Sequence, residues 1–126
     1  MAISSASSSG LLPTRNISAG YTLNAQSGTT FTPTMSDSTA VVTLDNASAI
    51  AVSIPTNATT PFPIGTQLVF IQTNTGQVTI SAASSGTTTI ASTAGTSASP
   101  KLRTQYSSAT ALKVNTDVWY VIGDVS

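Results

Sequence analysis

The sequence predicts an all-β protein, and three features of its composition support that fold class. Ser and Thr together supply 43 of the 126 residues, and Thr, being β-branched, suits the half-exposed surface of a strand. Glu is absent, and Lys and Arg together number four, so the residues that exposed helices usually recruit are scarce. Apolar residues recur in short runs between turn-forming residues, as in β-sandwiches and barrels. We therefore expect one small antiparallel β-sandwich or barrel-like domain.

The length of 126 residues suits a single domain. Charged residues make up only 6% of the chain and the net charge is zero, whereas disordered chains combine low hydrophobicity with high net charge. We expect a folded β-domain over residues 21–126. Residues 1–20 show neither a period of 2 nor one of 3.6 and predict an extended N-terminal arm, unless they form only a frayed terminus. The residues expected to dock this arm onto a larger particle are Ile3, Leu11, Leu12, Pro13 and Ile17.

Short apolar runs predict the strands. Residues 41–44 form the first convincing strand, and residues 50–54 alternate strictly until Pro55, which cannot donate to a ladder. Residues 66–72 are apolar on both faces and predict a central strand buried on both sides. The turn residues 73–76 and the run 77–80 then predict a hairpin.

The C-terminal third predicts a weak strand at 87–90 and further strands at 101–107, 111–114 and 117–122. The last is the densest apolar segment, so Trp119 is expected to anchor the core. The sequence contains no repeat of fixed period.

Catalytic chemistry has few candidates. The chain has no His, Cys or Glu, which excludes Ser–His–Asp and Cys–His catalysis within the chain itself. A glycosidase-like pair of Asp37 or Asp45 with Asp117 or Asp124 is geometrically conceivable, but each Asp lies beside a β-run, where Asp commonly stabilises turns. No Asp-x-Asp or glycine-rich phosphate motif occurs. We expect no enzyme, no cofactor and no metal site.

Partners are constrained in a similar way. Four basic residues cannot supply the phosphate contacts that nucleic-acid binding requires, and no apolar run approaches the ~20 residues of a membrane span. The N-terminus lacks the features of a signal peptide, so we expect a product that is made in a cytoplasm and used without a secretion signal. Tyr106 lies in a polar stretch and is the best candidate for an exposed aromatic that stacks on sugars.

Several segments together resemble a β-rich module of tailed-bacteriophage virion proteins. The resemblance covers roughly residues 40–124 and rests on residues 50–57 (IAVSIPTN), 62–67 (FPIGTQ), 72–80 (QTNTGQVTI), 102–114 (LRTQYSSATALKV) and 117–124 (DVWYVIGD). The module is similar to β-domains of phage tail-fibre, head-fibre and capsid-decoration proteins. Because such proteins are commonly homotrimers, the resemblance implies a homotrimer here.

The resemblance implies a structural protein of the virion. The short chain and its arm favour a capsid-decoration or head-fibre subunit that docks on the capsid or another virion protein. The alternative is a tail or tail-fibre component that binds a host-surface glycan. A neutral surface with few charges is poorly soluble as a free monomer, which agrees with self-association.

Overall fold

The computed structural model describes residues 20–94 and 99–126. These residues form short strands and one short 3-10 helix, η1 (Met35–Thr39). The strands are β2 (Thr22–Gln26), β3 (Thr30–Phe31), β4 (Ala40–Leu44), β5 (Ile50–Ile54), β6 (Gln67–Gln72), β7 (Val78–Ala82), β8 (Thr89–Ser92), β9 (Ser108–Asn115) and β10 (Val118–Gly123). The expectation of an all-β protein is confirmed. The predicted arm lies almost wholly outside the described residues, so its boundary with the β-domain stays a prediction.

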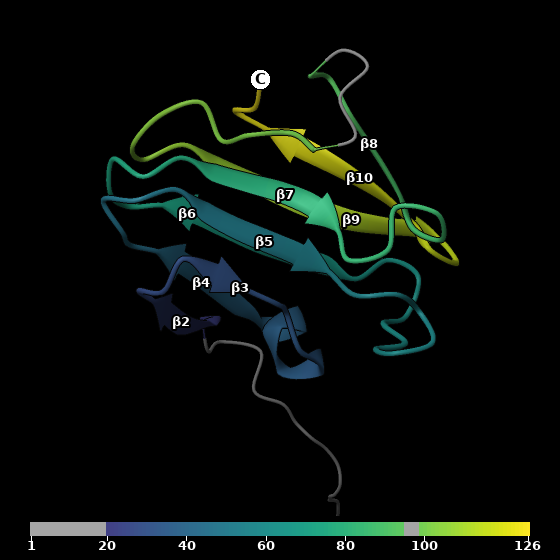
Figure 1. The fold of residues 1–126 in the computed structure, drawn as a ribbon. Helices are drawn as coiled ribbons and strands as arrows, with labels where there is room; N and C mark the ends of the chain where they lie inside the picture. The colour runs from purple at the N-terminus through teal and green to yellow at the C-terminus, as the bar shows by residue number, and fades with distance from the viewer. Residues whose placement is uncertain (1–19, 95–98) are drawn as a thin grey trace, which may run out of the picture.

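The strands form two sheets that lie one in front of the other (Figure 1). One has six strands in the order β2-β4-β6-β9-β10-β8, and the other has three in the order β3-β5-β7. The expectation of antiparallel pairing is wrong for most of the molecule, because only the β6/β9 and β9/β10 pairs are antiparallel. All other pairs of these strands are parallel.

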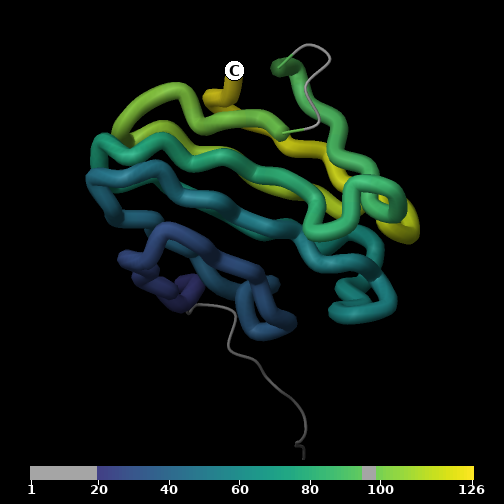
Figure 2. Tube along the Cα trace, viewed as in Figure 1, coloured from purple at the N-terminus to yellow at the C-terminus, as the bar shows by residue number. Residues whose placement is uncertain are grey.

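The parallel pairing arises because the chain changes sheet after each strand in its first half. β2, β4 and β6 enter the six-stranded sheet, whereas β3, β5 and β7 enter the other. Each strand pair is therefore one coil of a short solenoid, and successive coils stack in the same direction (Figure 2). The predicted hairpin of residues 66–72 with 77–80 is wrong for this reason: residues 73–77 carry the chain from β6 across to β7 in the other sheet.

The coils differ in length, which hides the repeat in the sequence. Thr22 pairs with Ala40, 18 residues later, whereas Val41 pairs with Val69, 28 residues later. No fixed period therefore runs through the chain, although a structural repeat is present.

Asparagines hold the stacked turns together. The Asn46 Nδ2 donates to the carbonyl oxygen of Ser27 in the preceding turn, 2.7 Å away. Asn74, which lies 28 residues beyond Asn46, donates from Nδ2 to Asp45 Oδ1 at 2.9 Å. Each Asn Oδ1 also accepts a backbone N–H of its own turn. These bonds satisfy polar groups where the chain leaves one sheet for the other.

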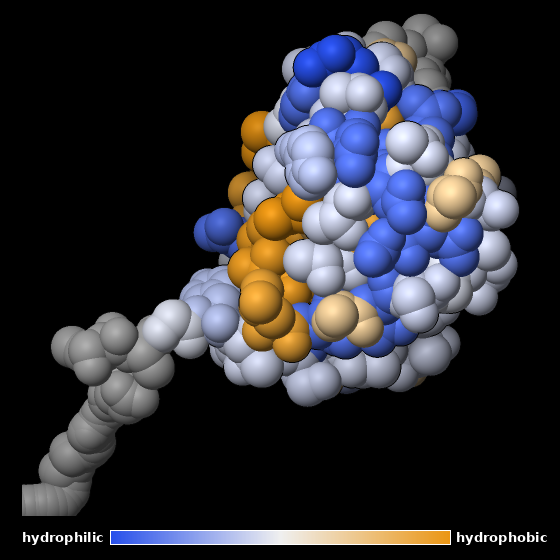
Figure 3. All heavy atoms as spheres, turned by 90° about the vertical axis from the view of Figure 1, so that its left-hand side faces the viewer, coloured by the Kyte–Doolittle hydropathy of each residue, from blue (hydrophilic) through white to orange (hydrophobic). Residues whose placement is uncertain are grey.

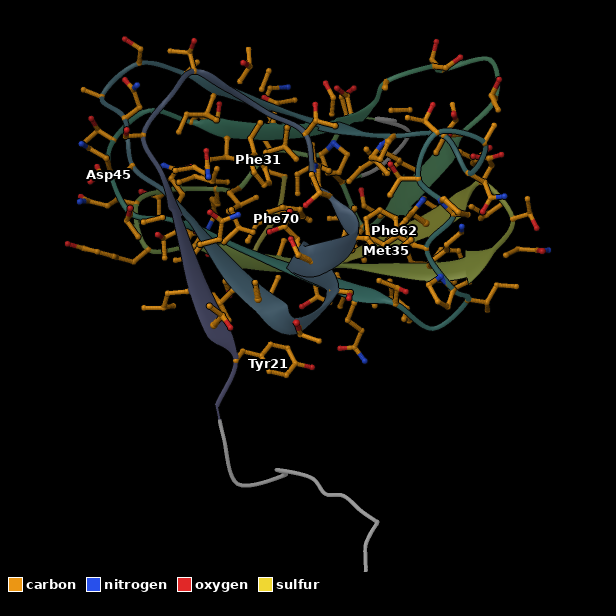
Figure 4. The ribbon with its side chains drawn as sticks, turned by 90° about the horizontal axis from the view of Figure 1, so that it is seen from below. Tyr21, Phe31, Met35, Asp45, Phe62 and Phe70 are labelled. Carbon is orange, nitrogen blue, oxygen red and sulfur yellow. The ribbon has the colours of Figure 1, made fainter. Side chains whose placement is uncertain are left out.

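One apolar cluster fills the space between the sheets. β4, β5 and β6 each bury alternate residues, as a half-buried strand does. Figure 4 shows Phe31, Phe62 and Phe70 between the layers. Trp119 is 1% exposed and meets the Phe62 ring edge-on, with 5.6 Å between centroids. The expected place of Trp119 in the core is confirmed.

The C-terminal part of the chain covers the last coil. The β9/β10 hairpin pairs with the free edge of β6, and β8 extends this sheet beyond β10. Over residues 101–107 the expected strand is wrong: Lys101 and Leu102 make isolated bridges and a turn follows. Leu102 donates its amide to the carbonyl oxygen of Val78, so this segment protects the edge of β7.

Candidate functional surface

The four aspartates accept hydrogen bonds from different parts of the chain. Asp37 accepts hydrogen bonds from Asn24 Nδ2 and the amide of Thr34, and it caps η1. Asp45 accepts from Asn74, as described above. Across residues 20–94 and 99–126, no two aspartates share a hydrogen-bond partner, and no group of three or more acidic side chains is placed to hold a metal ion. Asp37 and Asp45 therefore stabilise turns.

The other two aspartates also join distant segments. Asp117 has a φ of 54°, which Asp tolerates in turns, and its Oδ1 accepts from the Asn57 amide at 2.7 Å and the Thr88 hydroxyl at 3.1 Å. The Asp124 carboxylate accepts two hydrogen bonds from Arg103, one from Nε at 2.8 Å and one from Nη2 at 2.9 Å. The guanidinium bonds, followed by a bond from the Ser107 hydroxyl, hold the pKa of Asp124 below its ordinary value.

Lys113 is the one basic side chain that the described structure buries. It is 2% exposed, and its Nζ donates to Asn57 Oδ1 at 2.5 Å and to the Phe62 carbonyl oxygen at 2.7 Å. The same nitrogen lies 5.9 Å from the centroid of the Trp119 ring. Its contacts tie β9 to the loop after β5, which is a structural role that composition alone did not reveal.

The outer surface of the six-stranded sheet is strongly apolar. Its residues alternate with the buried ones along each strand and form rows across the sheet. One row runs through Leu23, Val41, Val69, Thr110 and Ile122 on five neighbouring strands. We call this surface the apolar face, and its large members are Leu23, Val41, Val69, Ile71, Leu112, Val114, Tyr120 and Ile122. The remaining members are Ala25, Thr43, Gln67, Thr89, Ala91, Ser108 and Thr110.

Several large side chains of the apolar face are exposed to solvent in the described structure. Leu23 is 69% exposed, Ile122 58% and Tyr120 47%. In Figure 3 hydrophobic side chains gather on the left of the body, the side of this sheet, while hydrophilic ones cover much of the rest. A hollow of about 440 Å³ lies at one end, lined by residues 91–93 and 120–123. Tyr21 lies on the same outer side of the sheet in Figure 4.

The three-stranded sheet provides an internal comparison. Its outward residues are small or polar: Thr30, Ala51, Ser53, Thr79 and Ser81. This sheet follows the usual alternation of an apolar inner and a polar outer face. The six-stranded sheet departs from it, and extended apolar surfaces of this kind usually mark interaction sites.

The apolar pattern of residues 66–72 is the sequence signal for this face. These residues are indeed apolar on both sides, and β6 is central, between β4 and β9. However, Val69 and Ile71 are only half-buried, because they lie on the outer surface. The prediction that this strand is buried on both sides is therefore wrong for the isolated chain.

The predicted site residues fall into two groups. Ile3, Leu11, Leu12, Pro13 and Ile17 lie outside the described residues. Tyr106 is 74% exposed, has a φ of 70°, and donates a hydrogen bond from its amide to the carbonyl oxygen of Gln72.

Within the described parts of the chain, no helix has the length and hydropathy needed to cross a membrane. No protein-family model, no curated protein and no solved structure matches this chain.

Proposed function

We propose that this chain is a structural subunit of a tailed-bacteriophage particle, assembled as a homotrimer and docked on the capsid as a decoration or head-fibre protein. The observation that carries the proposal is the apolar face, since a surface of this composition is suited to burial against protein. The four aspartates, Arg103 and Lys113 agree with it, because their charged groups are used to hold turns and loops in place.

The segments that resemble phage proteins support the same proposal. Residues 50–57, 62–67 and 72–80 follow one another through β5, the loop after it, β6, the sheet-changing turn and β7. The two C-terminal segments include the hairpin that covers this coil. These segments therefore come from neighbouring parts of the fold, although they leave out residues 68–71 of β6 and all of β8.

Docking on the particle is assigned to the N-terminal arm. Its isolated apolar residues can anchor a segment that is ordered on binding, and the described residues form an apolar cluster of their own that runs from Val42 to Val121. Deleting residues 1–16 should therefore leave folding and trimerisation intact but abolish incorporation into particles.

The experiment uses purified particles that lack the protein. Full-length and truncated protein are added separately, and bound copies are quantified after sedimentation. We expect binding of the full-length protein alone. Equal occupancy by the truncated protein would refute the arm as anchor, and failure of the full-length protein to bind any particle would refute the virion role.

A tail-fibre component that binds a host glycan is the second candidate, and Tyr106 favours it. Tyr106 is exposed, and it follows Gln105 in the chain, which lines a polar hollow of about 330 Å³ together with Thr75 and Arg103. Aromatic rings beside hydrogen-bonding groups suit sugars. Binding of the full-length protein to host cells, lost in Tyr106→Ala, would favour this function over capsid decoration.

A further inference from the structure

We infer that the apolar face is the surface through which copies of this chain pack against one another. The inference rests on the self-assembly in the proposed function and adds to it the contact surface. No described segment of the chain covers this face, and its most exposed large hydrophobic members, Leu23 and Ile122, lie on β2 and β10, with three strands between them.

The absence of charge indicates a second copy as the occupant. None of the members of the apolar face carries a charged side chain, and the seven charged residues of the described structure all lie elsewhere. A face without charge meets no repulsion from an identical face. It also offers nothing complementary to a nucleic acid or to another charged partner.

The composition of the face argues against a lipid surface. Proteins that lie on membranes usually combine an apolar surface with Lys and Arg beside it. Here Lys113 is buried, Arg103 is paired with Asp124, and the exposed Lys101 bridges to Thr79 of the three-stranded sheet. The face also carries Gln67, Ser108 and Thr110 among its apolar residues, and these polar groups are better satisfied against protein than in hydrocarbon.

The face is also regular enough for such packing. Its side chains stand in rows fixed by strand register, for example Gln67, Leu112, Tyr120 and Ala91 on four neighbouring strands. Six strands at a spacing of about 4.8 Å make a surface roughly 24 Å wide. The hollow beside Tyr120 and Ile122 lies at one end of it, and the exposed Leu23 lies on the edge strand β2 at the other. In a closed ring, one end of the face can meet the other end of the next copy.

Three full-length proteins test the inference: wild type, Ile122→Glu and Ala51→Glu. The first substitution places a charge on the apolar face, and the second is its control on the outer surface of the three-stranded sheet. Analytical ultracentrifugation should give a multiple of 12.7 kDa for wild type and Ala51→Glu, and 12.7 kDa for Ile122→Glu. Circular dichroism and Trp119 fluorescence report whether each protein is folded, and Leu23→Glu on the edge strand replaces Ile122→Glu if that variant unfolds.

Labelling provides an independent measurement, since the chain has no Cys. The Tyr120→Cys variant should react with a maleimide at least tenfold more slowly than Ala51→Cys, and the difference should vanish in urea. If the wild type, Ile122→Glu and Leu23→Glu are all oligomeric, and Tyr120→Cys is labelled as fast as Ala51→Cys, the copies do not pack through the apolar face. The homotrimer would then stand, but its contact surface would lie elsewhere.

A monomeric wild type would overturn the inference and the homotrimer together, and two further results would identify the true occupant. Slow labelling of Tyr120→Cys in a monomer would mean that the chain's own residues 1–19 cover the face. Flotation of the monomer with phosphatidylcholine vesicles would mean that a lipid surface does. Binding to particles is measured separately, so failure of the virion role remains distinguishable.

Discussion

The amide of Gly76 donates a hydrogen bond of 2.9 Å to the carbonyl oxygen of Asn46. The two residues lie in successive stacked turns. A Cβ atom at Gly76 would collide with the carbonyl oxygens of both Asn46 and Ser48. Ser48 precedes Gly76 by 28 residues, the same separation as the pair Ile50 and Val78. The close stacking of the coils therefore depends on the missing side chain at this position.

Gly76→Ala should lower the free energy of unfolding by about 1–3 kcal/mol, because backbone atoms must move to admit the methyl group. Gly86→Ala is the matched control, since nothing lies within 4 Å of a Cβ at that position. Urea unfolding followed by circular dichroism measures both. Equal stability of the two variants would show that the turns can separate without cost.

Trp119→Ala should cost ~3–5 kcal/mol, as expected for removing a large buried aromatic. Trp119 packs on Phe62 and lies beneath the Lys113 ammonium. Tyr106→Ala, at an exposed position, should change stability by no more than about 0.5 kcal/mol. A loss below about 1 kcal/mol for Trp119→Ala would contradict its place in the core.

Lys113→Met should lower stability by about 1–3 kcal/mol, because the Phe62 carbonyl oxygen then loses its buried donor. Lys101→Met, at an exposed position, serves as the control and should be near neutral. Thermal and urea unfolding compare the two. A gain in stability for Lys113→Met would show that burying the ammonium costs more than its hydrogen bonds return.

The Arg103–Asp124 pair should make stability depend on pH in acid. Because the folded pKa of Asp124 lies below its ordinary value of 3.8, its contribution is fully present above that pH. The contribution is lost as the pH falls through the lower folded pKa. Asp124→Asn should remove this part of the pH dependence, and Arg103→Gln should reduce it, because the bond from the Ser107 hydroxyl remains. The measurement is the urea midpoint between about pH 2 and 6. An unchanged pH profile in Asp124→Asn would assign the acid sensitivity to other groups.

For the candidate surface, the sequence supplied the residues but not their location. The apolar pattern on both sides of residues 66–72 was visible, and so was the scarcity of charge. A strand buried between two layers and a strand with one apolar side facing outward both carry apolar residues on both sides. The sequence pattern therefore does not distinguish these two locations. The buried Lys113 gave no signal either, because its partners Asn57 and Phe62 lie more than 50 residues away.

By itself, the sequence determined that the chain is all-β, that residues 50–54 form a strand ending before Pro55, and that Trp119 is in the core. These properties follow from composition and from a period of two, which are local. Only the tertiary structure decided that β4 lies parallel to β6 and β5 parallel to β7, and that residues 73–77 join two sheets. Strand direction and partner are set by hydrogen bonds between residues far apart in the chain, and alternation along one strand contains no information about its neighbour.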